Sequence, residues 1–211
     1  MEINQIEKLK ELYNKQSKHS NYQILASNFS KILPTEDLAI VSRYERERWE
    51  YISHIIDFYG KEIIDIGGNT GYFSFETINA GAKHVTYFEG NESHAEFVKL
   101  GAECIGISDC IIVNNRYYEF YDDKKSSADI ILLLNVLHHI GDDYEDSSLS
   151  LERAKLKILD ELNSMAKQCD IMVFQLGFNW KGSRELCMFE KGTKQEMIEY
   201  IVREAEVGEY Y

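Results

Sequence analysis

The stretch EIIDIGGNTGYFSF, residues 62–75, decides the fold. A run of β-type residues with one acid leads into Gly67, Gly68 and Gly71, and an aromatic, helix-like run follows. Glycine has no Cβ, so it fits a tight turn and lets a ligand approach bare backbone. In doubly wound α/β sheets, the turn from a strand to a helix lies at the carboxyl edge, where ligands bind. The stretch therefore predicts a strand, a ligand-binding turn and a helix.

Short β-type runs alternate with helical patterns along the rest of the chain. This alternation predicts an α/β fold with a doubly wound, mostly parallel sheet and helices on both faces. The β-type runs fall at 62–66, 84–89, 110–114, 129–134 and 170–175, and the helical patterns at 71–80, 92–106, 150–168 and 193–206.

The first 58 residues predict a helical extension. Residues 2–32 favour one or two helices and residues 36–58 a longer one, with Pro34 between them and Thr35 as a helix N-cap. We therefore expect an N-terminal helical cap over residues 1–58 and one globular ligand-binding domain over residues 59–211.

Composition and charge exclude several classes of protein. Hydrophobic residues make up 44% and charged residues 28% of the 211 residues, which is typical of a soluble globular chain. The longest apolar run, residues 130–134, is too short to span a bilayer, and the N-terminus lacks the apolar core of a secretory signal. We therefore expect a cytoplasmic protein without a membrane span. The net charge of −13 argues against nucleic acid as a partner.

The spacing of the glycines indicates which ligand the turn takes. A dinucleotide-binding turn has glycines at its first, third and sixth positions. Here they occupy the first, second and fifth positions, and Asn69, which tolerates a left-handed backbone, is third. The alternative is a tight turn that only serves helix packing. Glu89 ends the second β-type run, where an acid can accept hydrogen bonds from both hydroxyls of a ribose.

The glycine loop, Glu89 and the segment NVLHHI (135–140) together resemble the class I S-adenosylmethionine-dependent methyltransferases, over about residues 40–205. The resemblance implies a Rossmann-like sheet and S-adenosylmethionine as cofactor. Asn69 departs from the family's central glycine, and Asn114 and Asn115 stand where an acid is common. The cofactor-binding residues that the resemblance implies are Asp65, Gly67, Gly68, Asn69 and Gly71 for the methionine part, Glu89 for the ribose, Gly90, Asn91 and Asn115 for the adenine side, Asn135 and Val136 near the sulfonium, and Tyr22, Arg43 and Arg46 for the methionine carboxylate.

Two histidines are the candidate catalytic residues. His138 and His139 follow the fourth β-type run, and imidazole can act as a base near neutral pH. One of them is expected to face the acceptor, while the other packs or caps the loop. The acidic residues Asp142, Asp143 and Asp146 could instead hold a divalent cation with one histidine. Because acidic loops are common in a chain this acidic, we expect no metal.

The acceptor site is expected in residues 174–194, after the fifth β-type run. Aromatic and polar side chains together suit sugar rings and phosphorylated groups. This segment resembles bacterial surface-polysaccharide methyltransferases of the O-antigen type, which implies a carbohydrate, sugar-phosphate or other small-molecule acceptor. The alternative is that Phe178 and Trp180 pack against the sheet edge. The candidate acceptor-binding residues are Phe178, Asn179, Trp180, Lys181 and Arg184.

Only five β-type runs are present, whereas the resemblance implies seven strands with a C-terminal β hairpin. Truncation of the chain, a shorter variant of the fold, or a homodimer or other partner that covers the open edge would each explain the difference. Two other functions stay open. One is a nicotinamide-dependent Rossmann oxidoreductase, which the glycine spacing disfavours, and the other is a non-catalytic cofactor-binding subunit.

Overall fold

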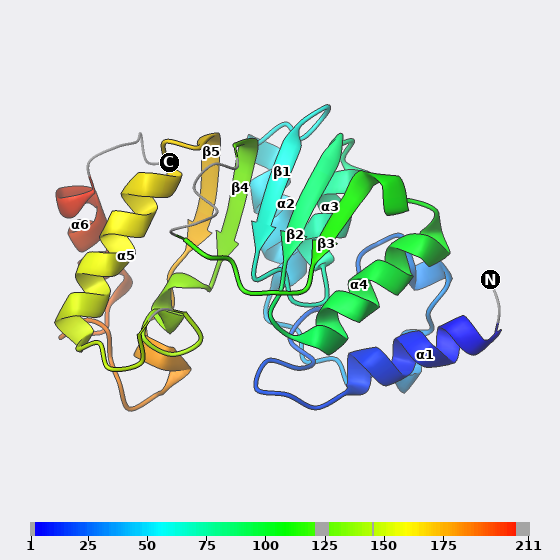
Figure 1. The fold of residues 1–211 in the computed structure, drawn as a ribbon, viewed down its shortest axis with the longest axis horizontal. Helices are drawn as coiled ribbons and strands as arrows, with labels where there is room; N and C mark the ends of the chain where they lie inside the picture. The colour runs from blue at the N-terminus through cyan, green and yellow to red at the C-terminus, as the bar shows by residue number, and fades with distance from the viewer. Residues whose placement is uncertain (1–2, 121–126, 145, 206–211) are drawn as a thin grey trace. The chain divides into compact units, whose positions relative to one another are not determined.

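The computed structural model describes residues 3–120, 127–144 and 146–205. By its internal packing the chain divides between residues 118 and 119 into two compact units, which we call unit 1 and unit 2 (Figure 1). Each unit is built around parallel β-strands.

Unit 1 contains three parallel strands in the order β3-β2-β1. They are β1 (Glu62–Ile66), β2 (His84–Phe88) and β3 (Ile111–Asn114), close to the predicted runs. Asp65 on β1 lies opposite Tyr87 on β2. Parallel strands are usually covered on both faces, which explains why β1 reads as an almost continuous apolar run with four buried residues out of five.

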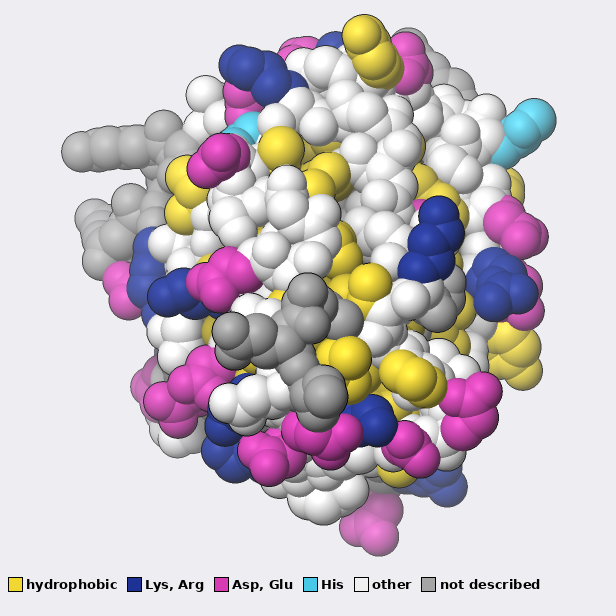
Figure 2. All heavy atoms as spheres, turned by 90° about the vertical axis from the view of Figure 1, so that its right-hand side faces the viewer, with side chains coloured by type: hydrophobic (Ala, Val, Ile, Leu, Met, Phe, Trp, Pro, Cys, Tyr) yellow, Lys and Arg dark blue, Asp and Glu magenta, His cyan; other side chains and the backbone are white. Residues whose placement is uncertain are grey.

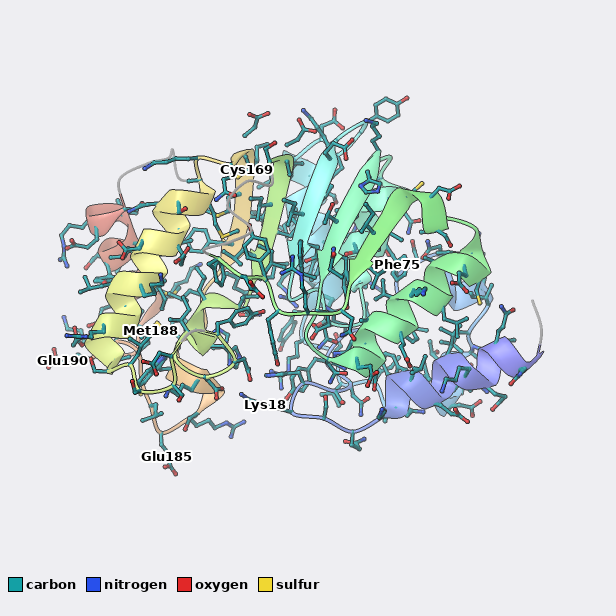
Figure 3. The ribbon with its side chains drawn as sticks, in the orientation of Figure 1. Lys18, Phe75, Cys169, Glu185, Met188 and Glu190 are labelled. Carbon is teal, nitrogen blue, oxygen red and sulfur yellow. The ribbon has the colours of Figure 1, made fainter. Side chains whose placement is uncertain are left out.

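The helices of unit 1 are α1 (Ile3–Asn14), α2 (Glu45–Ile55), α3 (Tyr72–Asn79) and α4 (Glu92–Ile105), and α1 lies along α4 (Figure 1). An aromatic cluster joins α3 and α4 to the N-terminal segment. The Phe29 ring centroid lies 4.7 Å from that of Phe75 on α3 and 5.5 Å from that of Phe97 on α4. Phe75, labelled in Figure 3, is fully buried at 1% exposure. The N-terminal segment is therefore part of the hydrophobic core of unit 1.

The predicted helix over residues 36–58 is wrong in its first third. Thr35–Asp37 form only a 3-10 turn, in which Thr35 is the first residue and not a cap. α2 begins at Glu45, after Tyr44 in a left-handed conformation (φ 64°). The physical reason is tertiary, because the Val41 N–H donates to the Asn21 carbonyl at 2.8 Å and so cannot also serve a helix. Over residues 2–32 the described helical pieces are α1 and a 3-10 turn at Phe29–Lys31.

Unit 2 contains the parallel pair β4 (Ala128–Leu134) and β5 (Cys169–Gln175), with Cys169 at the start of β5 (Figure 3). α5 (Leu151–Met165) connects the two strands and begins after Ser150, whose hydroxyl accepts from the Arg153 N–H. α6 (Lys194–Glu204) is capped in the same way by Thr193. Both helices thus start with the side-chain caps that serine and threonine favour.

Among the described residues, no helix combines the length and the apolar character that crossing a membrane requires.

Candidate cofactor and acceptor site

The glycine turn after β1 has the left-handed conformations that its sequence predicts. Gly67, Asn69 and Gly71 have φ angles of 67°, 53° and 80°. The N–H groups of Gly67 and Gly68 both donate to the Phe88 carbonyl, at 2.9 and 3.2 Å. These bonds hold the turn against the carboxyl end of β2, the edge at which a ligand was expected.

Packing beneath the turn explains two of the glycines. A Cβ on Gly68 would lie 2.6 Å from a ring carbon of Tyr87 and 2.9 Å from the Asp65 carboxylate. A Cβ on Gly71 would lie 2.7 Å from Val98 on α4. Side chains are thus excluded on the inner side of the turn by the protein itself, which is the packing alternative that the sequence left open.

Glu89 is held in place by backbone donors from two elements. Its carboxylate accepts from the Asn69 N–H at 2.9 Å and from the Asn91 N–H at 2.8 Å. The Tyr87 hydroxyl donates to the Asn69 carbonyl, which fixes the same peptide from the other side. The structure therefore brings Glu89, Asn69 and Asn91 together at one edge of unit 1, as the sequence predicts.

Asp65 lies beneath the turn. It is 3% exposed, and its carboxylate accepts from the Ser74 hydroxyl at 2.6 Å. Burial raises the pKa of the Asp65 carboxyl to about 6, and the hydrogen bond from Ser74 opposes this rise. In this structure the acid ties β1 to α3, so its predicted contact with the methionine part of a cofactor stays a prediction.

A loop after α1, residues 15–23, caps the glycine turn from outside. We call it the capping loop, and Lys18 marks it in Figure 3. The Asn69 side-chain amide donates to the His19 carbonyl at 2.8 Å. The Gln23 side-chain carbonyl accepts from the Tyr72 N–H at 3.0 Å and from the Thr70 hydroxyl at 3.3 Å. Gln23 thus satisfies a backbone donor at the start of α3, and no pattern in the sequence singles it out.

The predicted carboxylate-binding residues lie next to this loop. The Arg43 guanidinium carbon is 3.8 Å from the Tyr22 ring centroid, and the Tyr22 hydroxyl donates to the Lys18 carbonyl at 2.8 Å. Arg43 and Arg46 are exposed. A cation–π pair holds Arg43 beside the capping loop, so a carboxylate contact by Tyr22 or Arg43 stays a prediction.

The residues expected on the adenine side make contacts within the protein. Asn91 caps α4, because its side-chain oxygen accepts from the N–H groups of Ser93 and His94. The Asn115 amide donates to the Glu89 carbonyl at 3.1 Å. Both asparagines therefore stabilise the chain around Glu89.

His94 on α4 is a buried histidine with no hydrogen-bond partner on either ring nitrogen, and it is 1% exposed. Burial lowers the pKa of His94 to about 4, and the neighbouring His19 lowers it further. Because the folded pKa lies below the unfolded value of 6.5, this contribution to stability is complete above pH 6.5 and is lost as the pH falls toward 4.

We expect His94→Leu to flatten this part of the pH dependence. Between pH 7 and 4 the unchanged chain should lose about 3 kcal/mol more unfolding free energy than the variant. Urea unfolding at several pH values measures this difference. The Asp65 carboxyl titrates in both proteins and cancels in the comparison. Parallel curves for the two proteins would contradict the prediction.

In unit 2, the segment after β4 presents two adjacent histidines. Asn135 has a left-handed φ of 61°, and its N–H donates to the Gln175 carbonyl at 2.9 Å. His138 and His139 follow in a 3-10 turn, Leu137–His139, with their ring centroids 4.2 Å apart. Each histidine is 8% exposed. A strained residue before two packed histidines is a frequent feature of functional sites.

Two aspartates distinguish His139 from His138. The Nδ1 atom of His139 lies 3.3 Å from the Asp143 carboxylate and 3.5 Å from that of Asp142. A carboxylate beside Nδ1 favours the tautomer that carries its proton there and leaves Nε2 as the basic atom. His139 is therefore the better candidate base of the two.

Two glycines from the segment after β5 lie against these rings. A Cβ on Gly177 would be 2.9 Å from His138, and one on Gly182 would be 3.2 Å from Cε1 of His139. Trp180, between them, is 8% exposed, and its indole N–H donates to the Ile140 carbonyl at 2.7 Å. Trp180 therefore anchors this segment against the histidine turn.

The other predicted acceptor residues are distributed unevenly. Phe178 is 42% exposed, and Arg184 is also exposed. The Lys181 ammonium donates to the Ser147 carbonyl at 3.2 Å and lies 4.4 Å from the Trp180 ring centroid. Asn179 pairs in a short antiparallel bridge with Cys187. Phe178 and Arg184 thus remain accessible, whereas Trp180 serves packing.

Two solved structures match most of the chain. One, described as the bifunctional kinase-methyltransferase WbdD, has a TM-score of 0.62 at 14% identity, over 90% of this chain and 39% of that one. A structure of monomeric WbdD has a TM-score of 0.56 at 17% identity, over 85% of this chain and 41% of that one. The chain has the class I methyltransferase fold.

The methyltransferase fold spans only about two-fifths of the WbdD chains that it matches. No protein-family model matches the sequence. No curated protein sequence matches it either.

Surface charge is mixed on the face of this methyltransferase fold that Figure 2 shows. The described Lys and Arg side chains there lie apart, and Asp and Glu side chains lie between them. Contact with a nucleic-acid backbone requires clustered positive charge.

Proposed function

We propose that this protein transfers a methyl group from S-adenosylmethionine to a carbohydrate, sugar-phosphate or other small-molecule acceptor. The observation that carries the proposal is the oriented Glu89 carboxylate beside the glycine turn. Two backbone N–H groups, from Asn69 and Asn91, fix its direction at the carboxyl end of β2. A fixed carboxylate in this place suits the two hydroxyls of a ribose.

The residues around the turn fit an adenosyl cofactor. A carboxylate can accept about four hydrogen bonds, so its two backbone contacts orient Glu89 and leave its type of chemistry suited to hydroxyl donors. The exposed Arg43 offers a cation for a carboxylate. Asn135 and Val136 belong to the same proposal, as contacts near the sulfonium.

When bound, S-adenosylmethionine supplies an electrophilic methyl group on a good leaving group. The protein holds the acceptor oxygen or nitrogen in line with the methyl carbon, and such orientation is worth roughly 7–11 kcal/mol. As the new bond to carbon forms and the carbon–sulfur bond breaks, the acceptor proton passes to Nε2 of His139. S-adenosylhomocysteine then leaves with the electron pair of the broken bond.

Phe178, Arg184 and Lys181 support the carbohydrate part of the proposal. The exposed ring of Phe178 offers an apolar surface of the kind that a sugar ring can cover, and Arg184 can bind a phosphate through two parallel hydrogen bonds. The solved structures with this fold include a bifunctional kinase-methyltransferase, which makes a phosphorylated acceptor worth testing first.

Calorimetric titration of the purified chain with S-adenosylhomocysteine, S-adenosylmethionine and NADH tests the proposal. We expect the first two to bind and NADH not to bind. Binding of NADH alone would instead support an oxidoreductase. A non-catalytic subunit would bind the cofactor without turning over any acceptor unless a partner is added. An acceptor screen with sugars and sugar phosphates follows from a positive result.

Glu89→Gln is expected to weaken S-adenosylhomocysteine binding about 10- to 100-fold. The neutral amide loses charge-assisted hydrogen bonds, each worth about 1.5–3 kcal/mol, and presents one acceptor atom where the carboxylate presents two. Calorimetry measures the change, and Glu92→Gln, an exposed acid in the first turn of α4, is the matched control. Equal affinities of the Glu89 variant and the unchanged chain would remove Glu89 from the site.

A further inference from the structure

Tyr117 lies directly over Gly90 in unit 1. A Cβ on Gly90 would come within 2.6 Å of the Tyr117 ring carbons Cε1 and Cε2. The ring therefore fills the space that a side chain at residue 90 would take. At the same time Tyr117 is 44% exposed, so the ring is not enclosed by the protein.

The segment after β3 is tied to the end of β2 at this point. The Asn115 amide donates to the Glu89 carbonyl at 3.1 Å, and the Arg116 N–H donates to the Asn114 carbonyl at 3.0 Å. The Arg116 guanidinium carbon lies 4.9 Å from the Phe88 ring centroid. These contacts fix the chain on both sides of β2's end, so Tyr117 sits on an ordered support one residue from Glu89's neighbour Gly90.

We propose that the Tyr117 ring is the surface on which the adenine base of the cofactor stacks, an inference that rests on the proposed function. Glu89 would hold the ribose, and the base is joined to that same sugar. Gly90 follows Glu89 and offers no side chain to cover a flat ring. Tyr117 supplies the aromatic face that residue 90 lacks, and stacking on an aromatic face suits a purine.

The test compares the affinity for S-adenosylhomocysteine of the unchanged chain with that of Tyr117→Ala and Tyr117→Phe. Stacking of a base on an aromatic side chain is worth about 5- to 100-fold in affinity, so the alanine variant should bind about that much more weakly. The phenylalanine variant keeps the ring and should bind within about twofold. The same ratios are expected with 5′-methylthioadenosine, which has the base and the ribose but no amino-acid part.

Two further variants sharpen the test. Gly90→Ala would push the ring from its place and should weaken binding in the same direction. Tyr51→Ala removes a 62% exposed tyrosine on α2 and is the matched control, with no expected effect. Circular dichroism of each variant checks that it is folded.

The outcomes separate this inference from the proposed function. If the unchanged chain binds S-adenosylhomocysteine and the alanine variant binds equally well or more tightly, the stacking role is overturned while the proposed function stands. If the unchanged chain binds neither adenosyl ligand, the proposed function fails and the stacking role fails with it.

Discussion

Gly68→Ala should lower the affinity for S-adenosylhomocysteine by at least about 100-fold. The new methyl group would lie 2.6 Å from a Tyr87 ring carbon and 2.9 Å from the Asp65 carboxylate, and Tyr87 is fully buried and cannot move aside. The turn must therefore lift. Its displacement breaks the bond of 2.9 Å from the Asn69 N–H to Glu89, and with it the orientation of the carboxylate. Overpacking of this kind also costs about 1–3 kcal/mol of stability.

Calorimetry measures the affinity, and urea unfolding measures the stability of the same variant. Gly60→Ala is the matched control because Gly60 also has a positive φ (71°), but no atom lies within 4 Å of the position of its Cβ. The control should lose about 1 kcal/mol of stability from backbone strain and keep its affinity. A Gly68→Ala variant that binds as tightly as the unchanged chain would show that the turn does not position the ligand.

His139→Ala should lower turnover about 10²- to 10⁴-fold while leaving the affinity for S-adenosylhomocysteine within about twofold. The imidazole accepts the acceptor proton, so its loss affects the chemical step and not cofactor binding. Asp143→Ala should lower turnover in the same direction by a smaller factor, since the carboxylate 3.3 Å from Nδ1 only positions the ring. Single-turnover rates with an acceptor found by the screen measure both effects.

His138→Ala separates the roles of the two histidines. Its ring packs against Gly177, and the proposed mechanism gives it no proton to transfer. A larger loss of turnover in His138→Ala than in His139→Ala would exchange the two assignments. Unchanged turnover in both variants would show that the histidines are structural and that the acceptor needs no base.

The strands and their turn could be predicted from the sequence because local and tertiary preferences agree there. β1, at Glu62–Ile66, has the predicted bounds, since an apolar run buried in a parallel sheet has few other places to go. The left-handed conformations of Gly67, Asn69 and Gly71 follow from residue types that tolerate a positive φ. Glu89 could be placed because it ends the neighbouring strand.

The contacts that complete the site could not be predicted. Gln23 is an ordinary polar residue in the sequence, and only the fold brings it 49 positions along the chain to the Tyr72 N–H. Tyr117 gains its place from Gly90, which the sequence marks only as a residue after an acid. The pairing of Asp143 with His139 depends on how a short turn bends, and one residue more would separate them. The helix expected from residue 36 failed for the same reason, because a distant carbonyl took the Val41 N–H.

The bond from Gln23 to the Tyr72 N–H gives the capping loop a clock of its own. That amide lies in the first turn of α3, where no carbonyl within the helix can protect it. Its exchange with deuterated solvent therefore proceeds only while the side chain of Gln23 is displaced. The exchange rate of a single amide thus counts the openings of the loop after α1, independently of whether any methyl group is transferred.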